Sequence, residues 1–198
     1  MTLTERALRL NWLSGRTDLP AVILMSDEAR LPDPCAAAQR LAAGSAVLVR
    51  HRDTDARRAL VRTIAPICRA RGLLLIVADD LALCEAIEAN GLHLSQRRAA
   101  SADALGLRRR WRGLLTCAAH DARALRRAAL IGADAALLSP IFATASHPHG
   151  RPLGVARSLA LIRSAALPVY ALGGVSAASV GRLSAPNLVG VAGIGGLT

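Results

Sequence analysis

The sequence has almost no aromatic residues and no lysine. Only 2% of its 198 residues are aromatic, whereas 53% are hydrophobic, so aliphatic side chains must fill the core. All 25 basic residues are arginine, and the formal net charge is +11. Proteins that bind nucleic acid combine basic patches with aromatic stacking residues. Because aromatic residues are scarce and the arginines recur along helical patterns, we expect no nucleic-acid partner. Arg97–Arg98 and Arg108–Arg110 form the one cluster that departs from this pattern.

Closely spaced cysteines and long apolar runs are also missing. The four cysteines lie far apart and form no CxxC pair, which argues against a zinc site and favours buried thiols of a reducing compartment. They are Cys35, Cys68, Cys84 and Cys117. No apolar run has the length of a membrane span, and the sequence shows no signal-peptide pattern. We therefore predict a cytoplasmic protein without a membrane partner.

Short aliphatic runs recur eight times, and turn residues bound each of them. The predicted strands are 21–25, 46–49, 73–77, 92–94, 113–117, 135–138, 169–172 and 188–192. Helical patterns follow at least six of these runs, and aspartates such as Asp53 or Asp55 and Asp121 can cap them. Eight strand–helix repeats predict an α/β fold, the (β/α)8 TIM barrel. An open doubly wound sheet is the alternative, but no GxGxxG follows the first strand.

We expect one barrel domain over residues 1–198, with residues 1–20 as an N-terminal extension. About 200 residues is the short limit for this fold. Few residues follow the eighth predicted strand, so the final helix should be reduced or absent. The N-terminal segment or a second subunit would then cover the opening, and the oligomeric state, including a homo-oligomer, stays open.

The most informative stretch runs from Gly132 to Gly174. It predicts two parallel strands joined by a helix, and in such folds ligands bind beyond the carboxyl ends of the strands. Glycines follow the seventh strand at Gly173–Gly174 and the eighth at Gly193 and Gly195. Barrels often hold a phosphate there with backbone N–H groups, so we predict a site for a phosphorylated small molecule. Tight turns are the alternative reading of these glycines.

Histidine and aspartate residues near strand ends offer candidate chemistry. His120 follows the fifth strand and could act as an acid or base near neutral pH, or be held by the helix that follows. His93 lies within an apolar triplet and is predicted to pack inside the barrel. Asp79–Asp80 could hold Mg²⁺ beside a phosphate, whereas capping of the next helix is the alternative for one of the two.

Four stretches together resemble one known family. NGLHLSQ, TCAAHD, GADAALLSPIFATASHPHGRPLG and LPVYALGGVSAASVGRL are similar to thiamine phosphate synthase and its relative TenI, the thiazole tautomerase. The resemblance covers roughly residues 21–194. It implies a (β/α)8 barrel that binds thiazole phosphate or thiamine phosphate, a small phosphorylated substrate. It also implies that the phosphate is held by Gly173, Gly174, Gly193, Ile194 and Gly195.

Several positions depart from the synthase pattern. The Q-x-R-x-K that grips a pyrophosphate after the second strand reads Leu48, Arg50 and Arg52 here. The Asn-Asp pair after the third strand reads Ala78-Asp79, which keeps one candidate Mg²⁺ ligand, and the aspartate of G-Q-x-D after the fourth strand is Arg98. The serine of the fifth strand is Ala118, and the lysine after the sixth is His147. By resemblance the substrate pocket comprises Arg50, Arg52, Gln96, Thr144, Ser146 and His147.

The resemblance implies three functions. The first is a TenI-like isomerase, in which a histidine after the fifth strand shuttles a proton on a thiazole phosphate. His120 matches that position, and this reaction requires no cofactor. The second is a divergent thiamine phosphate synthase, a transferase that joins thiazole phosphate to hydroxymethylpyrimidine pyrophosphate with Mg²⁺. The third is a non-catalytic barrel that binds thiamine phosphate. We favour the first function, because tautomerisation needs only proton transfer and a phosphate anchor.

Overall fold

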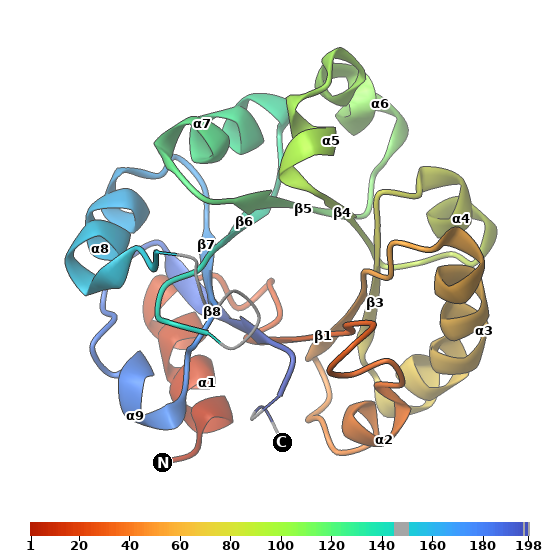
Figure 1. The fold of residues 1–198 in the computed structure, drawn as a ribbon, viewed down its shortest axis with the longest axis horizontal. Coiled ribbons are helices and arrows are strands. Elements are labelled where there is room, and N and C mark those ends of the chain that lie inside the picture. The colour runs from red at the N-terminus through yellow and green to blue at the C-terminus, as the bar shows by residue number, and fades with distance from the viewer. Residues whose placement is uncertain (145–150, 196, 198) are drawn as a thin grey trace.

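Eight parallel strands close into a barrel in the order of the sequence, with the last strand paired to the first. The computed structural model describes residues 1–144, 151–195 and 197. Figure 1 shows the ring of strands with the helices outside it. The strands are β1 (Val22–Met25), β2 (Ala46–Val49), β3 (Leu74–Ala78), β4 (Gly91–Leu94), β5 (Leu114–Ala119), β6 (Ala135–Leu138), β7 (Val169–Leu172) and β8 (Leu188–Gly193). This arrangement confirms the predicted TIM barrel.

The helices are of very unequal length. The longer ones are α1 (Leu3–Ser14), α3 (Thr54–Arg71), α7 (Ala122–Ile131) and α8 (Gly154–Ser164). The shorter ones are α2 (Cys35–Ala38), α4 (Leu81–Ala86), α5 (Gln96–Ala100), the 3₁₀ helix η1 (Ala102–Gly106), α6 (Leu107–Arg110) and α9 (Ala177–Val180). Among the described residues, none of these helices has both the length and the hydropathy needed to cross a bilayer.

Aliphatic side chains bury both faces of the sheet. In β2, Ala46 and Leu48 belong to the cluster inside the barrel, whereas Val47 and Val49 belong to the cluster under the helices. This alternation explains why the strands read as continuous apolar runs in the sequence. Tyr170 is the one aromatic residue in the inner cluster, and its hydroxyl donates a hydrogen bond to the carbonyl of Pro20 at 2.7 Å.

Local signals set the ends of the long helices. Asp53 and Asp121 accept hydrogen bonds from the third residue of α3 and of α7, as the sequence predicts. Gly72 and Gly132 end the same helices in the left-handed conformation. Asp33–Pro34 followed by an alanine-rich run predicts a helix that ends at Gly44, but the observed helix is only α2, because i to i−3 hydrogen bonds tighten the backbone after Ala38.

The N-terminal helix covers the last strand. No helix follows β8 within the described residues, and α1 packs on the outer face of this strand (Figure 1). The Nδ2 of Asn11 donates to the carbonyls of Leu19 at 3.0 Å and Val189 at 3.1 Å, and the Thr4 hydroxyl donates to the carbonyl of Leu197 at 2.8 Å. The sequence left open whether the N-terminal segment or a second subunit covers the eighth strand. In the structure the N-terminal helix covers it.

Candidate functional site

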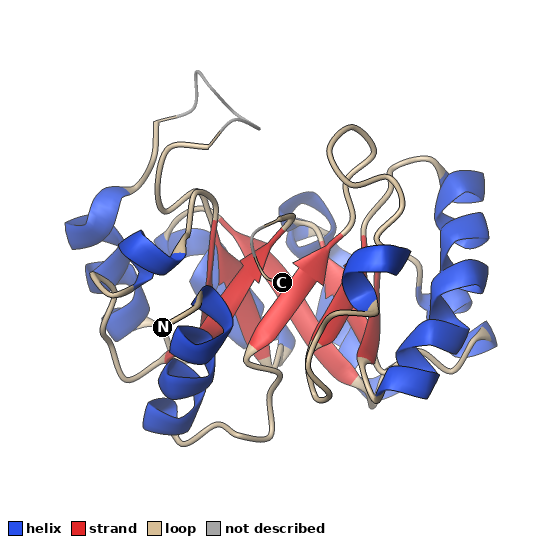
Figure 2. Cartoon of the chain, turned by 90° about the horizontal axis from the view of Figure 1, so that it is seen from below, coloured by secondary structure: helices blue, strands red, loops and turns tan. Residues whose placement is uncertain are grey.

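The residues predicted for the site follow different strands of the closed barrel. Because all eight strands are parallel, their carboxyl ends share one rim, called the mouth here (Figure 2). The rim carries Arg50 and Arg52 after β2, Asp79 after β3, Gln96 after β4, His120 after β5, Thr144 after β6, Gly173 and Gly174 after β7, and Gly193, Ile194 and Gly195 at β8. Ser146, His147 and His149 lie outside the described residues.

His120 is exposed at the mouth, and the Nδ1 side of its ring contacts Ser139. Its Nδ1 lies 2.7 Å from the carbonyl oxygen of Ser139 and 3.2 Å from the Ser139 hydroxyl. A carbonyl oxygen only accepts hydrogen bonds, so the neutral ring carries its proton on Nδ1. The Nε2 atom is then the unprotonated nitrogen, which can take a proton from a ligand.

A second histidine lies deeper in the barrel. His93 is buried, and its Nδ1 lies 2.9 Å from the hydroxyl of Thr116 on the neighbouring strand. Burial lowers the pKa of His93 to about 4, so this imidazole is neutral at physiological pH. The packing role predicted for His93 agrees with this position.

The β1–β2 side of the mouth carries paired charges. Residues 27–31, the β1 strap, follow β1, and Arg50 follows β2. The Nη2 of Arg50 donates to Oδ2 of Asp27 at 2.5 Å, and Nη2 of Arg30 donates to the same atom at 2.9 Å. The hydrogen bonds from Arg30, with a smaller contribution from the charge of Arg50, lower the pKa of Asp27 to about 2. Burial lowers the pKa of Arg50, and its Nε atom is buried without a partner in the described part of the chain.

Glu28 ties the β1 strap to the loop after β2. One of its carboxylate oxygens accepts the backbone N–H of Arg52 at 2.7 Å and that of Asp53 at 3.2 Å. These two hydrogen bonds, the one from Asp53 foremost, lower the pKa of Glu28. The predicted pocket residues Arg50 and Arg52 therefore both contact carboxylates of this chain, Arg50 through its guanidinium and Arg52 through its backbone.

Packing against the loop after β6 also explains why two glycines follow β7. Gly173 and Gly174 adopt φ angles of 90° and 65°, which favour glycine. A Cβ at Gly173 would lie 2.9 Å from Cα of Pro140, and one at Gly174 would lie 2.8 Å from Cβ of Phe142. The loop after β6 lies directly against this turn, since the N–H of Phe142 donates to the carbonyl of Gly173 at 2.9 Å. Gly195, in contrast, has open space around it, and its phosphate-binding role stays a prediction.

The carboxylates of the mouth do not form a metal site by themselves. Oδ1 of Asp79 accepts the N–H of Ser95 at 2.8 Å, while Asp80 caps α4 and pairs with Arg57. Arg98, which stands where the synthase pattern has an aspartate, is exposed and reaches Asp103 at 3.9 Å. No group of three potential ligands occurs among the described residues. Mg²⁺ usually takes only one or two protein carboxylates together with substrate phosphate oxygens, so Asp79 is left as a single candidate ligand, and its metal role stays a prediction.

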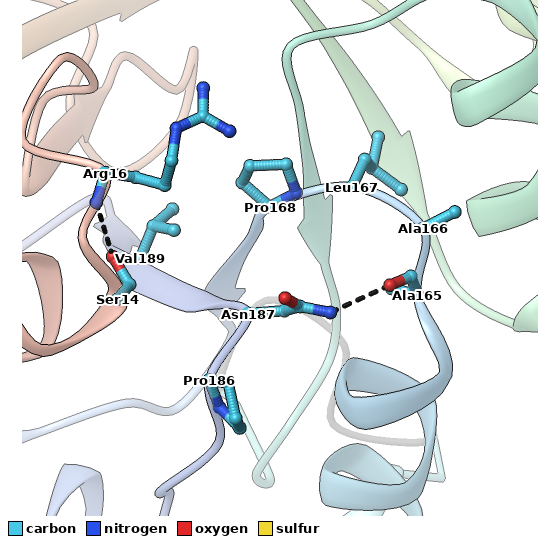
Figure 3. A pocket seen from close by; sticks show the side chains of 9 residues that line it. All are labelled: Ser14, Arg16, Ala165, Ala166, Leu167, Pro168, Pro186, Asn187 and Val189. Atoms are coloured by element: carbon cyan, nitrogen blue, oxygen red, sulfur yellow. Dashed lines mark hydrogen bonds between the residues drawn. The ribbon is translucent and has the colours of Figure 1, made fainter.

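One described cavity lies far from this chemistry. A space of about 290 Å³ opens at the amino-terminal ends of β7 and β8, next to Pro168, Asn187 and the end of α1 (Figure 3). Its one charged lining residue, Arg16, is paired with Asp18 at 2.9 Å. The cavity faces away from the mouth, so we do not assign the site to it.

Sequence reasoning missed three residues that shape the mouth. No role for Asp27 or Glu28 is predicted from the sequence, although the pattern Ser-Asp-Glu after a strand is itself a sign of polar contacts at the rim. Arg57 is buried on α3, where its Nη1 donates to the carbonyl of His51 at 2.8 Å and its Nη2 approaches Asp80 at 3.4 Å. The signal for Arg57 is its spacing, because it falls on the apolar face of α3 with Val61 and Ile64.

The chain is similar to known proteins over most of its length. The family described as thiamine monophosphate synthase matches residues 22–197. A thiamine-phosphate synthase from Chromobacterium violaceum is 34% identical over 186 residues, which cover 86% of this chain and 83% of that protein. The thiamine-phosphate synthase from Alcanivorax borkumensis is 34% identical over 196 residues, which cover 93% of this chain and 83% of that protein.

One solved structure shares the fold. The thiamine phosphate pyrophosphorylase from Pyrococcus furiosus aligns with a TM-score of 0.72 over 89% of this chain and 86% of that chain, at 18% identity. A likeness at this level of identity speaks for the barrel alone. The sequence relatives and the matched residues carry the relationship beyond the fold.

Proposed function

The chain belongs to the thiamine monophosphate synthase family, and from this premise we propose that it is an enzyme that binds a thiazole phosphate at the mouth and moves a proton on it with His120. The observation that carries the proposal is the contact between His120 and Ser139. It fixes the proton on Nδ1 and leaves Nε2 as the base at an exposed position on the rim.

The reaction that fits this arrangement is a tautomerisation. Nε2 of His120 takes a proton from one atom of the thiazole ring, which leaves an imidazolium and a delocalised anion. The imidazolium then returns a proton to another ring atom, so the ligand is isomerised and the protein is restored. No electron, metal ion or second substrate is needed. The charge on the imidazolium is stabilised by the Ser139 carbonyl, which accepts a hydrogen bond from the Nδ1–H group throughout the reaction.

The phosphate would be held at the turns after β7 and β8. Barrels commonly bind phosphate at the turns after β7 and β8, and both turns here are rich in glycine. Gly193 and Gly195 have no side chain to keep a ligand away from the backbone. Nothing lies within 4 Å of the place where a Cβ of Gly195 would be, so a ligand can approach this backbone closely. Anchoring by the phosphate would hold the thiazole ring near His120 and so lower the entropic cost of bringing the two reacting groups together.

A divergent thiamine phosphate synthase is the second candidate. The relatives from C. violaceum and A. borkumensis carry that name, and Arg50 and Arg52 keep two cationic positions after β2. When bound, Mg²⁺ would neutralise the pyrophosphate that departs in such a transfer. Asp79 is left as one candidate Mg²⁺ ligand and Arg98 stands where the synthase pattern has the other carboxylate, which is why we place this function second.

The test compares wild-type protein with His120→Ala and His120→Gln. Tautomerisation of a thiazole phosphate is followed by NMR, and ligand binding by thermal shift. We expect both variants to lose about a hundredfold or more in rate while their ligand-induced shift stays close to that of the wild type. Full activity of His120→Ala would overturn the proposal. Release of pyrophosphate from a diphosphate substrate only when Mg²⁺ is added would favour the synthase instead.

A further inference from the structure

We propose that Asp27 and Glu28 are specificity-determining residues that keep a second anionic group out of the mouth. They occupy the cationic β1–β2 side, so the site accepts a ligand with a single phosphate and excludes one that also carries a diphosphate. The inference rests on the proposed function in one respect, namely that the mouth is the ligand site. It does not depend on the role of His120.

The β1 strap is a closed and well-bonded turn. The N–H of Asp27 donates to the carbonyl of Leu31 at 3.0 Å, and the reverse bond measures 2.9 Å. The Asp27 carboxylate also accepts the backbone N–H groups of Ala29 at 3.2 Å and Arg30 at 3.1 Å. These bonds fix the direction of the Asp27 side chain, so its contact with Arg50 is preorganised.

Asp27 takes the guanidinium that a ligand anion would use. The Arg50 side chain is about one-third exposed, and its Nη2 donates a hydrogen bond to Asp27. With its pKa lowered to about 2, Asp27 is ionised at neutral pH, where a phosphate ester is also ionised. A phosphate oxygen that approaches Arg50 therefore competes with an existing charge-assisted hydrogen bond and meets a negative charge beside it.

Glu28 blocks the backbone donors next to Arg50. Its carboxylate accepts the N–H groups of both Arg52 and Asp53, and adjacent backbone N–H groups are donors that phosphate oxygens also prefer. The two strap carboxylates thus occupy Nη2 of the Arg50 guanidinium and two backbone donors that lie together on one side of the rim. The chain supplies its own anions at this position.

The turns after β7 and β8 have no such carboxylates, although β8 pairs directly with β1. Residues 173–177 after β7 and 193–195 at the end of β8 contain neither aspartate nor glutamate. The rim is therefore uneven in charge: the glycine-rich turns carry no acid, whereas at β1–β2 two carboxylates already contact the guanidinium groups of Arg30 and Arg50 and the backbone of Arg52. One phosphate can be accommodated at the glycine-rich turns, whereas a second anion at β1–β2 would have to displace Asp27 and Glu28.

The test measures anion binding to the full chain without turnover. Dissociation constants for pyrophosphate and for inorganic phosphate are determined by calorimetry in the presence of EDTA, for wild type, Glu28→Ala and Asp27→Asn. The matched control is Asp55→Ala. This variant removes an exposed carboxylate from the first turn of α3, the helix that Asp53 caps. A double variant, Glu28→Ala with Arg50→Ala, localises the effect.

We expect pyrophosphate to bind about tenfold more tightly to Glu28→Ala or Asp27→Asn than to the wild type and Asp55→Ala. The affinity for inorganic phosphate should stay within about twofold, and the double variant should lose the gain. Pyrophosphate binding that is unchanged or weaker in both single variants overturns the inference. Should Asp27→Asn fail to fold, Glu28→Ala decides alone, because it leaves Arg50 and Asp27 in contact. Inactivity of the chain as a tautomerase would overturn the proposed function and leave this result standing.

Discussion

The Nδ1 of His120 and the backbone carbonyl of Ser139 lie 2.7 Å apart, across the ends of two neighbouring strands. The Ser139 hydroxyl, at 3.2 Å, is the weaker of the two contacts on this nitrogen. The carbonyl belongs to the backbone and survives any substitution at this position. The tautomer of His120 should therefore be robust to loss of the serine side chain.

Ser139→Ala should consequently lower the tautomerisation rate by no more than about fivefold, far less than His120→Ala. The rate constants and the pH profiles of both variants, measured side by side, provide the check. A loss in Ser139→Ala equal to that of His120→Ala would mean that the hydroxyl itself transfers the proton.

The buried His93 predicts how stability depends on pH. Its pKa is about 4 in the folded protein and about 6.5 in the unfolded chain, so between these values the unfolded state binds more protons. The contribution of His93 is therefore present above pH 6.5 and is lost as the pH falls towards 4, by at most about 3 kcal/mol. Urea denaturation from pH 4 to pH 7 measures this slope. In His93→Gln the slope should flatten, and an equal slope in both proteins would show that other groups cause it.

Gly174 should not tolerate a side chain. Alanine there would combine a φ of 65° with overlap against Phe142 and the carbonyl of Ala143. We expect Gly174→Ala to lower the free energy of unfolding by about 1–3 kcal/mol or more. Gly106→Ala is the control, because nothing lies within 4 Å of that Cβ and its φ is −92°. Equal denaturation midpoints for the two variants would show that the loop after β6 yields to the added methyl group.

Arg57 should contribute to stability although it lies on the helical layer. It is 8% exposed and joins the carbonyl of His51 to the carboxylate of Asp80. Removal of one partner leaves buried polar groups unpaired, so Arg57→Ala should cost about 2–4 kcal/mol. The neighbouring Arg58 is exposed, and Arg58→Ala should stay within about 0.5 kcal/mol of the wild type. Denaturant midpoints that coincide for the two variants would contradict the structural role of Arg57.

The barrel could be predicted from the sequence because each strand is apolar on both faces. The runs 135–138 and 169–172 coincide with β6 and β7 as observed. The capping residues Asp53 and Asp121 are local signals, which depend only on the next few residues. Once the order of strands is known, the topology alone brings residues such as His120 and Gly173 to one rim.

Contacts across the mouth could not be predicted in the same way. Asp27 and Arg50 are 23 residues apart, and their pairing depends on the conformation of the β1 strap as well as on the adjacency of β1 and β2. The same holds for His120 and Ser139, since a backbone carbonyl carries no sequence signal. The glycines after β7 show the converse problem, because a pattern typical of phosphate turns also has a steric cause in the loop of Pro140 and Phe142.

The hydrogen bond from Asn11 to Val189 has a consequence for how the protein is made. Helix α1 leaves the ribosome before any strand of the barrel, yet the strand on which it rests is synthesised after the other seven. Until β8 has emerged, the buried residues Leu3 and Ala7 have no apolar surface to cover, and the ring cannot close between β8 and β1. Closure of this barrel therefore waits for β8, and nascent chains that stall before β8 should be substrates for chaperones and proteases.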